Sequence, residues 1–402
     1  MNKLALSQYT GHYIDQDDID AIVNILKESE LLTTGKQIGI FEQALVDYLN
    51  QNCQLPAYMS VCSNGTAALH LAYMGLNIGK GDVVIIPSMT FLATASAVLM
   101  AGAHIVFCDV DKLTGLISID KLGDAFNEAK QLGSPRAVVC VHLNGQMCEM
   151  RPLLDFAREH GLYLIEDACH ALGGWYIKDK TSYAMANAMQ SDAACFSFHP
   201  AKAITTGEGG GVLTRNHDTK CLIDKLRSHG IERNAMRFQK NEQAVSKNGV
   251  PNPWYYEMQQ LGYNYRINDL QCALGTSQLK KLDRFIAKRK LLVAHYIKRL
   301  KDLDPHIRHV YHMQDQEPAF HLMVVLINFE FFKITRAQLM HDLKEKNIGT
   351  QVHYIPLYRH PFWKSYAKIS NFKNTESYYH QVLSLPLMVS MEQEDVDYVV
   401  DH

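Results

Sequence analysis

Short β-branched or apolar runs alternate with helical patterns through the first half of this chain, and no other feature constrains the fold as strongly. The predicted strands span residues 58–63, 83–87, 105–109, 137–142, 163–167, 193–197 and 211–214. Helical patterns lie between the first five, at residues 67–75, 93–100, 118–131 and 151–160. Such alternation predicts an α/β fold with a mostly parallel seven-stranded sheet and helices on both faces.

The pattern changes after about residue 270. Residues 270–300 predict one long helix, followed by a strand near 322–329 and a helix near 336–346. A chain of 402 residues is long enough for two domains. The expected division is therefore an N-terminal arm (1–15), a large domain (16–265) and a smaller C-terminal α/β domain (266–402). The polar segment 241–252 predicts an exposed loop.

Charge and hydropathy exclude several classes of partner. The net charge is −2, and no basic cluster indicates nucleic-acid binding. Residues 83–107 carry no Asp, Glu, Lys or Arg over a length that could span a membrane, but Pro87 and Gly102 interrupt them. A strand, a loop, a buried helix and a second strand are the better interpretation, so we expect no membrane partner.

The nine cysteines and the N-terminus indicate a location in the cell. The cysteine count is odd, no two form a Cys-x-x-Cys pair, and several lie in apolar runs that predict buried free thiols. The N-terminus has no adequate apolar stretch for a secretion signal. Both observations favour a reducing compartment, and we expect a cytoplasmic protein.

In a mostly parallel sheet, ligands bind beyond the C-terminal ends of the strands. The predicted strands end at the loops that start at Ser63, Pro87, His142, Asp167 and Ser197. These loops are where chemistry is expected.

The segment 192–211, DAACFSFHPAKAITTGEGGG, carries the strongest chemical signal. A predicted strand ends at Ser197, and Lys202 follows in a tight loop. An amine in such a pocket can have a lowered pKa and can attack a carbonyl to form a Schiff base. Glycines 209–211 let the backbone pass close to a bulky ligand. An exposed loop lysine is the alternative for this segment taken alone.

The segment 163–173, YLIEDACHALG, places Asp167 at a strand end and His170 three residues later. A carboxylate there can pair with a protonated pyridine nitrogen and keep the ring cationic, while His170 could bond the ring oxygen. The alternatives are a helix N-cap by Asp167 or a metal site. The ligand spacing of a metal site is missing, so no metal is expected.

Two further strand ends carry weaker signals. Residues 62–70, CSNGTAALH, pass from a strand into a helix that begins at Thr66, and free N–H groups there suit a phosphate. A nucleotide-hydrolysing P-loop is not supported, because Gly-x-x-x-x-Gly-Lys is absent. Phe91 could stack on an aromatic ring or could equally be a core side chain.

Two later segments mix aromatic and polar residues within a short length. They are residues 261–269, LGYNYRIND, and residues 351–358, QVHYIPLY. Such mixtures suit the recognition of a sugar or a nucleotide, and packing at an interface or in the core is the alternative.

Taken together, the SFHPAK, TTGEGG and EDACHALG segments resemble the DegT-type sugar aminotransferases, which depend on pyridoxal 5'-phosphate (PLP) and have the aspartate aminotransferase fold, PLP fold type I. The resemblance runs from Tyr9 to the end of the chain. Residues 254–289 and 351–363 look like the branch that serves pseudaminic acid biosynthesis, and hence a surface polysaccharide or flagellin glycosylation.

The resemblance implies PLP as cofactor, glutamate as amino donor, a nucleotide-linked 4-keto-6-deoxy sugar as acceptor, and a homodimer with shared active sites. Lys202 would bind PLP covalently and carry the proton, and Asp167 would pair with the pyridine nitrogen. The other residues implied for the cofactor are Gly65, Thr66, Phe91, His170, Ser197 and Asn264 of the other subunit. Those implied for the substrate are Tyr9, Leu31, Leu32, Thr33, Gly65, Ser197, Asn264, His353, Tyr354, Ile355 and Pro356.

The chain departs from the family pattern at one place. Glu30 stands where relatives can carry a basic residue, and the following turn reads LLTTGK. Both lie near the expected sugar site, so a dTDP-linked sugar or a 3-keto sugar stays open as substrate. Lys202 favours transamination, because dehydratases of the family carry a histidine there. A PLP-binding regulatory protein without turnover is the alternative from a different class. A nicotinamide enzyme has no support, since no Gly-x-Gly-x-x-Gly follows the first strand.

Overall fold

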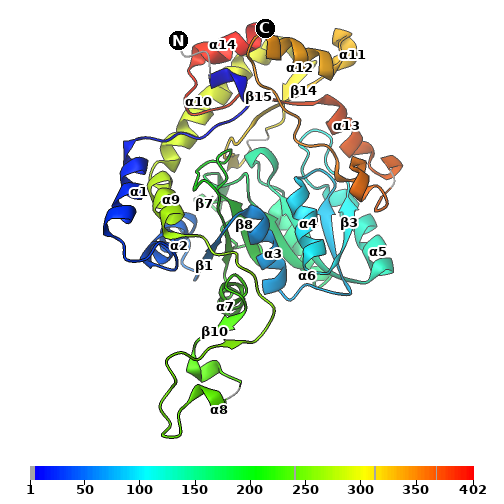
Figure 1. Cartoon of the computed structure of the whole chain (residues 1–402). Helices are drawn as coiled ribbons and strands as arrows, with labels where there is room; N and C mark the ends of the chain where they lie inside the picture. The colour runs from blue at the N-terminus through cyan, green and yellow to red at the C-terminus, as the bar shows by residue number, and fades with distance from the viewer. Residues whose placement is uncertain (1–4, 240, 312–313, 368) are drawn as a thin grey trace.

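A seven-stranded sheet forms the centre of the molecule, with the strand order β1-β9-β8-β5-β4-β2-β3 (Figure 1). The structure is a computed structural model and describes residues 5–239, 241–311, 314–367 and 369–402. The strands are β1 Tyr58–Cys62, β2 Asp82–Pro87, β3 His104–Cys108, β4 Ser134–Val141, β5 Tyr163–Asp167, β8 Ala193–Ser197 and β9 Gly210–Thr214. Only β9 runs against its neighbours, β1 and β8, and the other pairs are parallel. The predicted α/β fold with seven strands is confirmed.

Both faces of this sheet are buried, which explains why its strands are apolar without a break. Along β2, Val83 and Ile85 face one core, whereas Val84 and Ile86 face the other, because successive side chains of a strand point to opposite faces. One core is closed by α2 Lys36–Leu49, α5 Leu122–Leu132 and α6 Met150–Glu159. The other is closed by α3 Gly65–Gly75, α4 Leu92–Met100 and α7 His217–Leu226.

The C-terminal part builds a second, smaller sheet above the first in Figure 1. Its antiparallel strands, in the order β12-β14-β15, are Ile307–His309, Met323–Ile327 and Val382–Leu385. The helices of this part are α10 Leu282–Leu300, α11 Phe329–Phe332, α12 Arg336–Glu345, α13 Lys373–Gln381 and α14 Gln393–Asp401. The predicted strand near 322–329 and helix near 336–346 are confirmed as β14 and α12.

The single long helix predicted over residues 270–300 is wrong. The chain forms α9 Asp269–Leu279 and α10, with a turn at Lys280 and Lys281 between them. Neither glycine nor proline marks the turn. Lys281 is instead buried against Asp15 and Asp18, with its Nζ 2.9 Å from Asp18 Oδ1, so a tertiary ion pair accompanies the break. Helix α9 packs on α1 Gln16–Glu28 and on α2, and the boundary between 265 and 266 stays a prediction.

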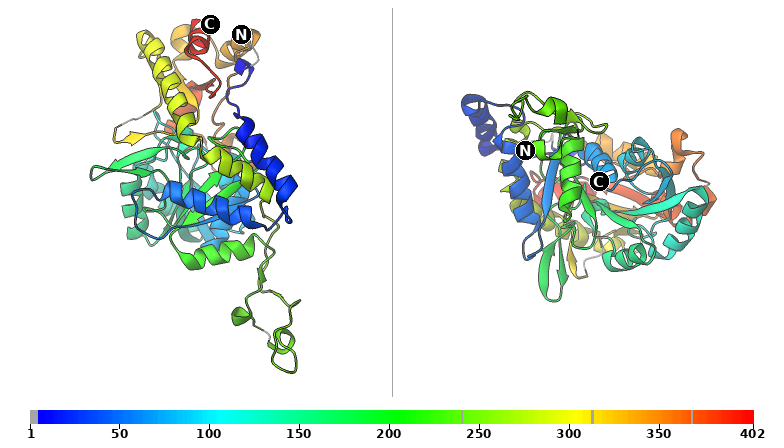
Figure 2. Two further views of the ribbon diagram at one scale, coloured as in Figure 1. Left: turned by 90° about the vertical axis from the view of Figure 1, so that its left-hand side faces the viewer. Right: turned by 90° about the horizontal axis from the view of Figure 1, so that it is seen from below.

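A narrow arm leaves the body below the large sheet. Figures 1 and 2 show the segment with β10 Ile231–Glu232, α8 Asn241–Ala244 and β11 Glu257–Met258 extending away from the large sheet, with β10 next to α7. The predicted loop at 241–252 therefore contains a short helix. Large apolar side chains on this arm are exposed, among them Met236 (92%) and Trp254 (67%).

Several short elements complete the described chain. A three-stranded sheet in the order β13-β6-β7 joins Gln316–Glu317, Trp175–Lys178 and Thr181–Ala184. The 3-10 helices are η1 Ala5–Ser7, η2 Ile119–Lys121, η3 Leu143–Gly145, η4 Ala235–Arg237, η5 Lys301–Leu303, η6 Leu357–Arg359, η7 Pro361–Trp363 and η8 Ile369–Asn371.

The charge-free stretch 83–107 folds as β2, a loop, α4 and β3, as predicted. In the part of the chain that the structure describes, no helix combines the length and the apolar character that crossing a membrane requires. All nine cysteines are free thiols, and most of them are buried.

Candidate active site

A cavity of about 570 Å³ opens at the C-terminal edge of the large sheet. Four of the five predicted loops supply lining residues, and the fifth strand end supplies Val141, directly before His142. Of the residues predicted for the site, ten line this cavity: Tyr9, Gly65, Thr66, Phe91, Asp167, His170, Ser197, Lys202, His353 and Tyr354. The remaining lining residues are Asn64, Ala67, Leu69, Thr90, Ala93, Val141, Cys169, His199, Ala201, Glu208 and Tyr265.

Lys202 stands in the turn that follows β8, and the backbone N–H of this residue donates to the carbonyl of His199 at 2.8 Å. Burial lowers the pKa of the Lys202 amine, and the nearby Cys169 and Asp167 oppose that shift. A lysine with a lowered pKa is more often neutral near pH 7, and a neutral amine can attack a carbonyl. The position and the electrostatics of Lys202 therefore suit a nucleophile.

Asp167 is the last residue of β5 and is only 5% exposed. Its Oδ2 accepts a hydrogen bond from Thr94 Oγ1 at 2.7 Å, and its Oδ1 accepts from the Cys169 N–H at 3.2 Å. Thr94 Oγ1 in turn lies 2.8 Å from Thr90 Oγ1, which must donate because the Thr94 proton points to the carboxylate. These bonds hold the buried carboxylate in one orientation.

His170 is held between a backbone donor and a tyrosine. The Asn144 N–H donates to His170 Nδ1 at 3.2 Å, so the proton of the neutral ring sits on Nε2 and is donated to the Tyr354 hydroxyl at 3.1 Å. Burial holds the pKa of His170 well below its usual value, with Lys202 and His353 adding to the effect. His170 is therefore neutral, and the proton of the Tyr354 hydroxyl is left for another acceptor.

One end of the cavity is built to receive an anion. Helix α3 begins there at Gly65, and Asn64 caps it by accepting from the Ala67 N–H at 2.8 Å. The first N–H groups of a helix have no partner within the helix, so those of Gly65 and Thr66 are available to a phosphate. A Cβ atom at Gly65 would lie 2.8 Å from the Cβ of Ser197, so only glycine fits where α3 meets the end of β8.

Aromatic rings form another part of the cavity lining. Phe91 lines the cavity and is 53% exposed, which corrects the alternative that it is a core side chain. Its ring centre lies 5.9 Å from that of Tyr354. Tyr9 and His353 face each other at 5.0 Å, and burial lowers the pKa of His353 to about 3, helped by Lys202. Neutral rings on this side can contact a ring or a sugar.

These residues fit the cofactor that the family resemblance implies. Gly65, Thr66 and Ser197 would hold its phosphate, Asp167 its ring nitrogen, and Lys202 its aldehyde carbon. Such a ligand would use three separate features of the cavity. These are the close approach of Gly65 to Ser197, the first N–H groups of α3, and the buried carboxylate of Asp167 with its fixed orientation.

Six predicted residues lie outside the cavity. Ile355 is exposed and Pro356 is buried behind the lining residue Tyr354. Leu31, Leu32 and Thr33 form a surface turn in which the Leu32 carbonyl accepts from the Asp269 N–H at 3.0 Å. The last of the six, Asn264, is exposed on the segment that leads into α9.

The sequence did not identify several residues that support the site. Thr94 holds Asp167, and Tyr265 lines the cavity while its hydroxyl lies 3.2 Å from His70 Nδ1. Asn64 and Glu208 stand inside segments that the sequence did single out, so their positions next to Gly65 and the glycine cluster were the available signal. Thr94 and Tyr265 also stand in short segments that the sequence singled out, but the bond from Thr94 to Asp167 could not be predicted, because it depends on how α4 packs against β5.

Comparisons with known proteins agree with this geometry. The model of the DegT/DnrJ/EryC1/StrS aminotransferase family matches residues 12–402. The UDP-4-amino-4,6-dideoxy-N-acetyl-β-L-altrosamine transaminase of Campylobacter jejuni is 35% identical over 394 residues, with 98% of this chain and 95% of that protein covered. The spore coat polysaccharide biosynthesis protein SpsC of Bacillus subtilis is also 35% identical, over 397 residues, with the same coverage of 98% and 95%.

Similarity extends to a solved structure. Helicobacter pylori PseC, an aminotransferase involved in the biosynthesis of pseudoaminic acid, superimposes with a TM-score of 0.85 at 27% identity, covering 98% of this chain and 96% of that chain. The similarity therefore includes both sheets and is not confined to the motifs around the cavity.

Proposed function

We propose, because this chain belongs to the DegT/DnrJ/EryC1/StrS aminotransferase family, that it transfers the amino group of glutamate to C4 of a nucleotide-linked 4-keto-6-deoxy sugar. Membership makes it a PLP-dependent aminotransferase of nucleotide sugars. The product that we propose is UDP-4-amino-4,6-dideoxy-N-acetyl-β-L-altrosamine, as an intermediate of pseudaminic acid biosynthesis. The identity to the Campylobacter jejuni transaminase over nearly the full length supports this product.

The observation that carries the reaction type is the position of Lys202 in one cavity with Asp167. A lysine with a lowered pKa and a buried carboxylate fixed by two hydrogen bonds lie at the ends of the neighbouring strands β8 and β5. Transamination needs an amine that can be released and can then move a proton, and it needs a fixed negative charge at the ring nitrogen.

The residues of the chain then have distinct tasks. When bound, PLP supplies an electron sink for the carbanion at the carbon that loses or gains the amino group. Lys202 would hold the cofactor through its amine and, once free, would carry a proton to and from the substrate carbon. Asp167 would keep the ring nitrogen protonated, and Thr94 holds that carboxylate in place. His170 and Tyr354 orient a hydroxyl proton toward the cavity.

The nucleotide sugar would occupy the aromatic side of the cavity. Tyr9, His353 and Tyr354 offer rings and hydroxyl groups there, and such surfaces suit a sugar with few charges. Tyr354 lies close to the cofactor-binding residue His170, so the keto group of the sugar would approach from this side.

We also propose a homodimer in which each cavity is completed by the other copy. The turn at Leu31–Thr33 and Asn264 carry predicted site residues but lie outside the cavity of their own chain. Leu31 is 54% and Leu32 45% exposed. Met236 and Trp254, on the arm that carries β10, α8 and β11, are exposed as well. Exposed apolar side chains of this size are typical of surfaces that a partner covers.

A substrate panel tests the proposal in two steps. The purified protein is first given glutamate alone, and formation of α-ketoglutarate is measured. It is then given a UDP-linked 4-keto-6-deoxy sugar, a dTDP-linked 4-keto sugar and a 3-keto sugar, and amino-sugar products are identified by mass spectrometry and NMR. No α-ketoglutarate would contradict transamination itself and favour a non-catalytic PLP-binding protein. α-Ketoglutarate with product from only the dTDP or 3-keto sugar would contradict the proposed substrate alone.

A further inference from the structure

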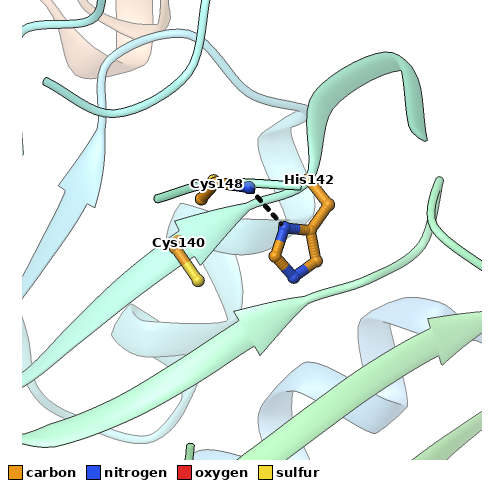
Figure 3. Close-up of side chains that lie close together, drawn as sticks. All are labelled: Cys140, His142 and Cys148. Carbon is orange, nitrogen blue, oxygen red and sulfur yellow. Dashed lines mark hydrogen bonds between the residues drawn. The ribbon is translucent and has the colours of Figure 1, made fainter. Parts of the chain in front are cut away.

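Three sulfur and nitrogen donors from β4 and the loop after it lie together inside the large domain (Figure 3). The donors are Cys140 Sγ, a ring nitrogen of His142 and Cys148 Sγ, and these atoms lie within 4.8 Å of one another. The three residues are 0%, 0% and 3% exposed, and none of them lines the active-site cavity. The proposed transamination gives this cluster no task.

The backbone brings the three donors together. Cys140 and His142 are two residues apart at the end of β4, so their side chains point to the same side of the strand. The chain then turns back through η3, where Asn144 has φ 63° and Gly145 has φ 87°. At Gly145 a Cβ atom would lie 2.9 Å from the carbonyl oxygen of His170, so the turn is tight and returns Cys148 toward Cys140.

The orientation of His142 is fixed from its far side. Its Nε2 donates to Glu166 Oε2 at 2.8 Å, and the other oxygen of this carboxylate accepts from Ser191 Oγ at 2.5 Å. Glu166 is only 2% exposed. A histidine whose second ring nitrogen donates to a carboxylate is the usual arrangement of a metal ligand, because the carboxylate sets the tautomer and makes the ligand more basic. Here it leaves Nδ1 as the ring nitrogen without a proton, and its lone pair accepts the backbone N–H of Cys148 at 3.1 Å.

We propose that Cys140, His142 and Cys148 bind one thiophilic divalent cation of the zinc class. Two thiolates and a neutral imidazole are donors that zinc prefers, and the fourth position of a tetrahedral ion is left to a small ligand such as water. On binding, each thiol releases a proton to solvent, so two negative sulfurs balance the two positive charges of the ion. This neutrality makes binding in a buried place feasible.

Binding requires a small local adjustment. Zinc bonds of about 2.3 Å to sulfur and about 2.0 Å to nitrogen place tetrahedral donors roughly 3.6 to 3.8 Å apart. The donors, which lie within 4.8 Å of each other, must therefore close by up to about 1 Å. The Cys148 N–H, which donates to His142 Nδ1 at 3.1 Å, must turn away so that this lone pair can reach the ion.

The ion would fix the loop that supports the active site from behind. The Asn144 N–H in this loop holds His170 Nδ1, and the backbone N–H of His142 donates to the Asp167 carbonyl at 3.1 Å. The role that we infer for the ion is therefore to hold this loop in place, and the ion takes no part in the chemistry of the cavity.

Metal analysis of the untagged, PLP-loaded protein tests this site. The protein is purified without chelators, given equimolar Zn²⁺ and desalted, and zinc is counted by inductively coupled plasma mass spectrometry. We expect about one zinc per chain, and at least a tenfold lower content in Cys148→Ser, since a direct ligand is lost. Cys108→Ser is the matched control, because it removes a buried thiol at the corresponding position of β3 and should leave the zinc content unchanged.

X-ray absorption at the zinc edge of the wild-type protein keeps the test decisive if Cys148→Ser does not fold. Two sulfur neighbours and at least one nitrogen neighbour are expected. The proposal is overturned by a wild-type protein that retains no zinc, by zinc with only oxygen and nitrogen neighbours, or by a disulfide between Cys140 and Cys148 in the peptide map.

Discussion

The residues that the sequence assigns to one active site occupy two different regions of the molecule. In the cavity, Asp167 and His170 are buried and have hydrogen-bond partners in the same chain. On the surface, Leu31 and Leu32 are about half exposed, and Asn264 is exposed on the segment that leads into α9. The side chains of the first region find their partners within one chain. Those of the second region stay exposed, because no part of their own chain covers them.

The surface region is nevertheless well anchored. The carboxylate of Asp269 accepts from the N–H groups of Gly35 and Gln37 at 2.8 and 3.0 Å, which fixes the start of α2 directly after the turn. Thr33 also pairs with Asn268 as an isolated bridge. A turn that is held in place while its apolar side chains stay exposed is preformed for a partner, and this is the physical basis for proposing a second copy of the chain.

The largest expected effect is in the cavity. Lys202→Ala should lower kcat for amino transfer by at least about 10³-fold, because it removes both the covalent link and the proton carrier. The visible absorption of cofactor bound to lysine should disappear, which a spectrum of the purified variant checks. Lys121→Ala, an exposed change at the end of η2, is the control and should behave as wild type. Normal turnover by Lys202→Ala would refute the assignment of this cavity.

A mixing experiment tests whether the two regions meet across subunits. Asn264→Asp should lower activity about 10- to 100-fold by placing a negative charge near the phosphate. When Asn264→Asp and Lys202→Ala chains are unfolded and refolded together, mixed dimers should each contain one intact site. Activity should then return to about a quarter of wild type.

The readout of that experiment is the activity of the mixture compared with each variant refolded alone. Two copies of the same variant refolded together serve as the control and should keep only the low activity of that variant. No recovery in mixtures that are shown by mass spectrometry to contain mixed dimers would mean that Asn264 acts within its own chain, and the comparison between the regions would have to be abandoned.

The smallest expected effect is on the pH dependence of stability, and it comes from a buried histidine beside the cavity. Burial, with the positive charges of Lys202 and Arg289 adding to it, holds the pKa of His321 well below its usual value, and its ring lies 4.2 Å from that of His170. The unfolded chain takes up a proton at His321 below about pH 6.5 and the folded chain does not, so stability is lost as the pH falls. The loss is up to about 1.4 kcal/mol per pH unit for one histidine.

His321→Asn should therefore reduce the pH dependence of the free energy of unfolding between pH 6.5 and 5, as measured by denaturant titration. Only the slope is compared, because the substitution also changes packing at every pH. His341→Asn, at an exposed histidine on α12, should leave the slope of the wild type unchanged. Equal slopes for His321→Asn and wild type would show that His321 is protonated in the folded protein.

Much of the fold was readable because its signals are local. The strands appear as apolar runs, since both faces of the sheet are buried, and the loops that follow them carry Lys202, Asp167 and Gly65 at the edge where ligands bind. The break at Lys281 could not be predicted, because the ion pair that accompanies it joins Lys281 to Asp15 and Asp18 at the start of α1, far away in the sequence. The contacts of Thr94 with Asp167 and of Asn144 with His170 could not be predicted either, because they also join segments that are distant in the sequence.

The sequence by itself determined the fold class and the edge of the sheet that holds the site. It also singled out Lys202 and Asp167 at the ends of two strands, because each of these signals depends on neighbours along the chain. Only the tertiary structure decided that Asn144 sets the tautomer of His170, that Cys140, His142 and Cys148 converge, and that Leu31–Thr33 and Asn264 lie outside the cavity of their own chain. Those outcomes depend on how distant segments pack, and side-chain directions across such contacts follow from the assembled core rather than from local spacing.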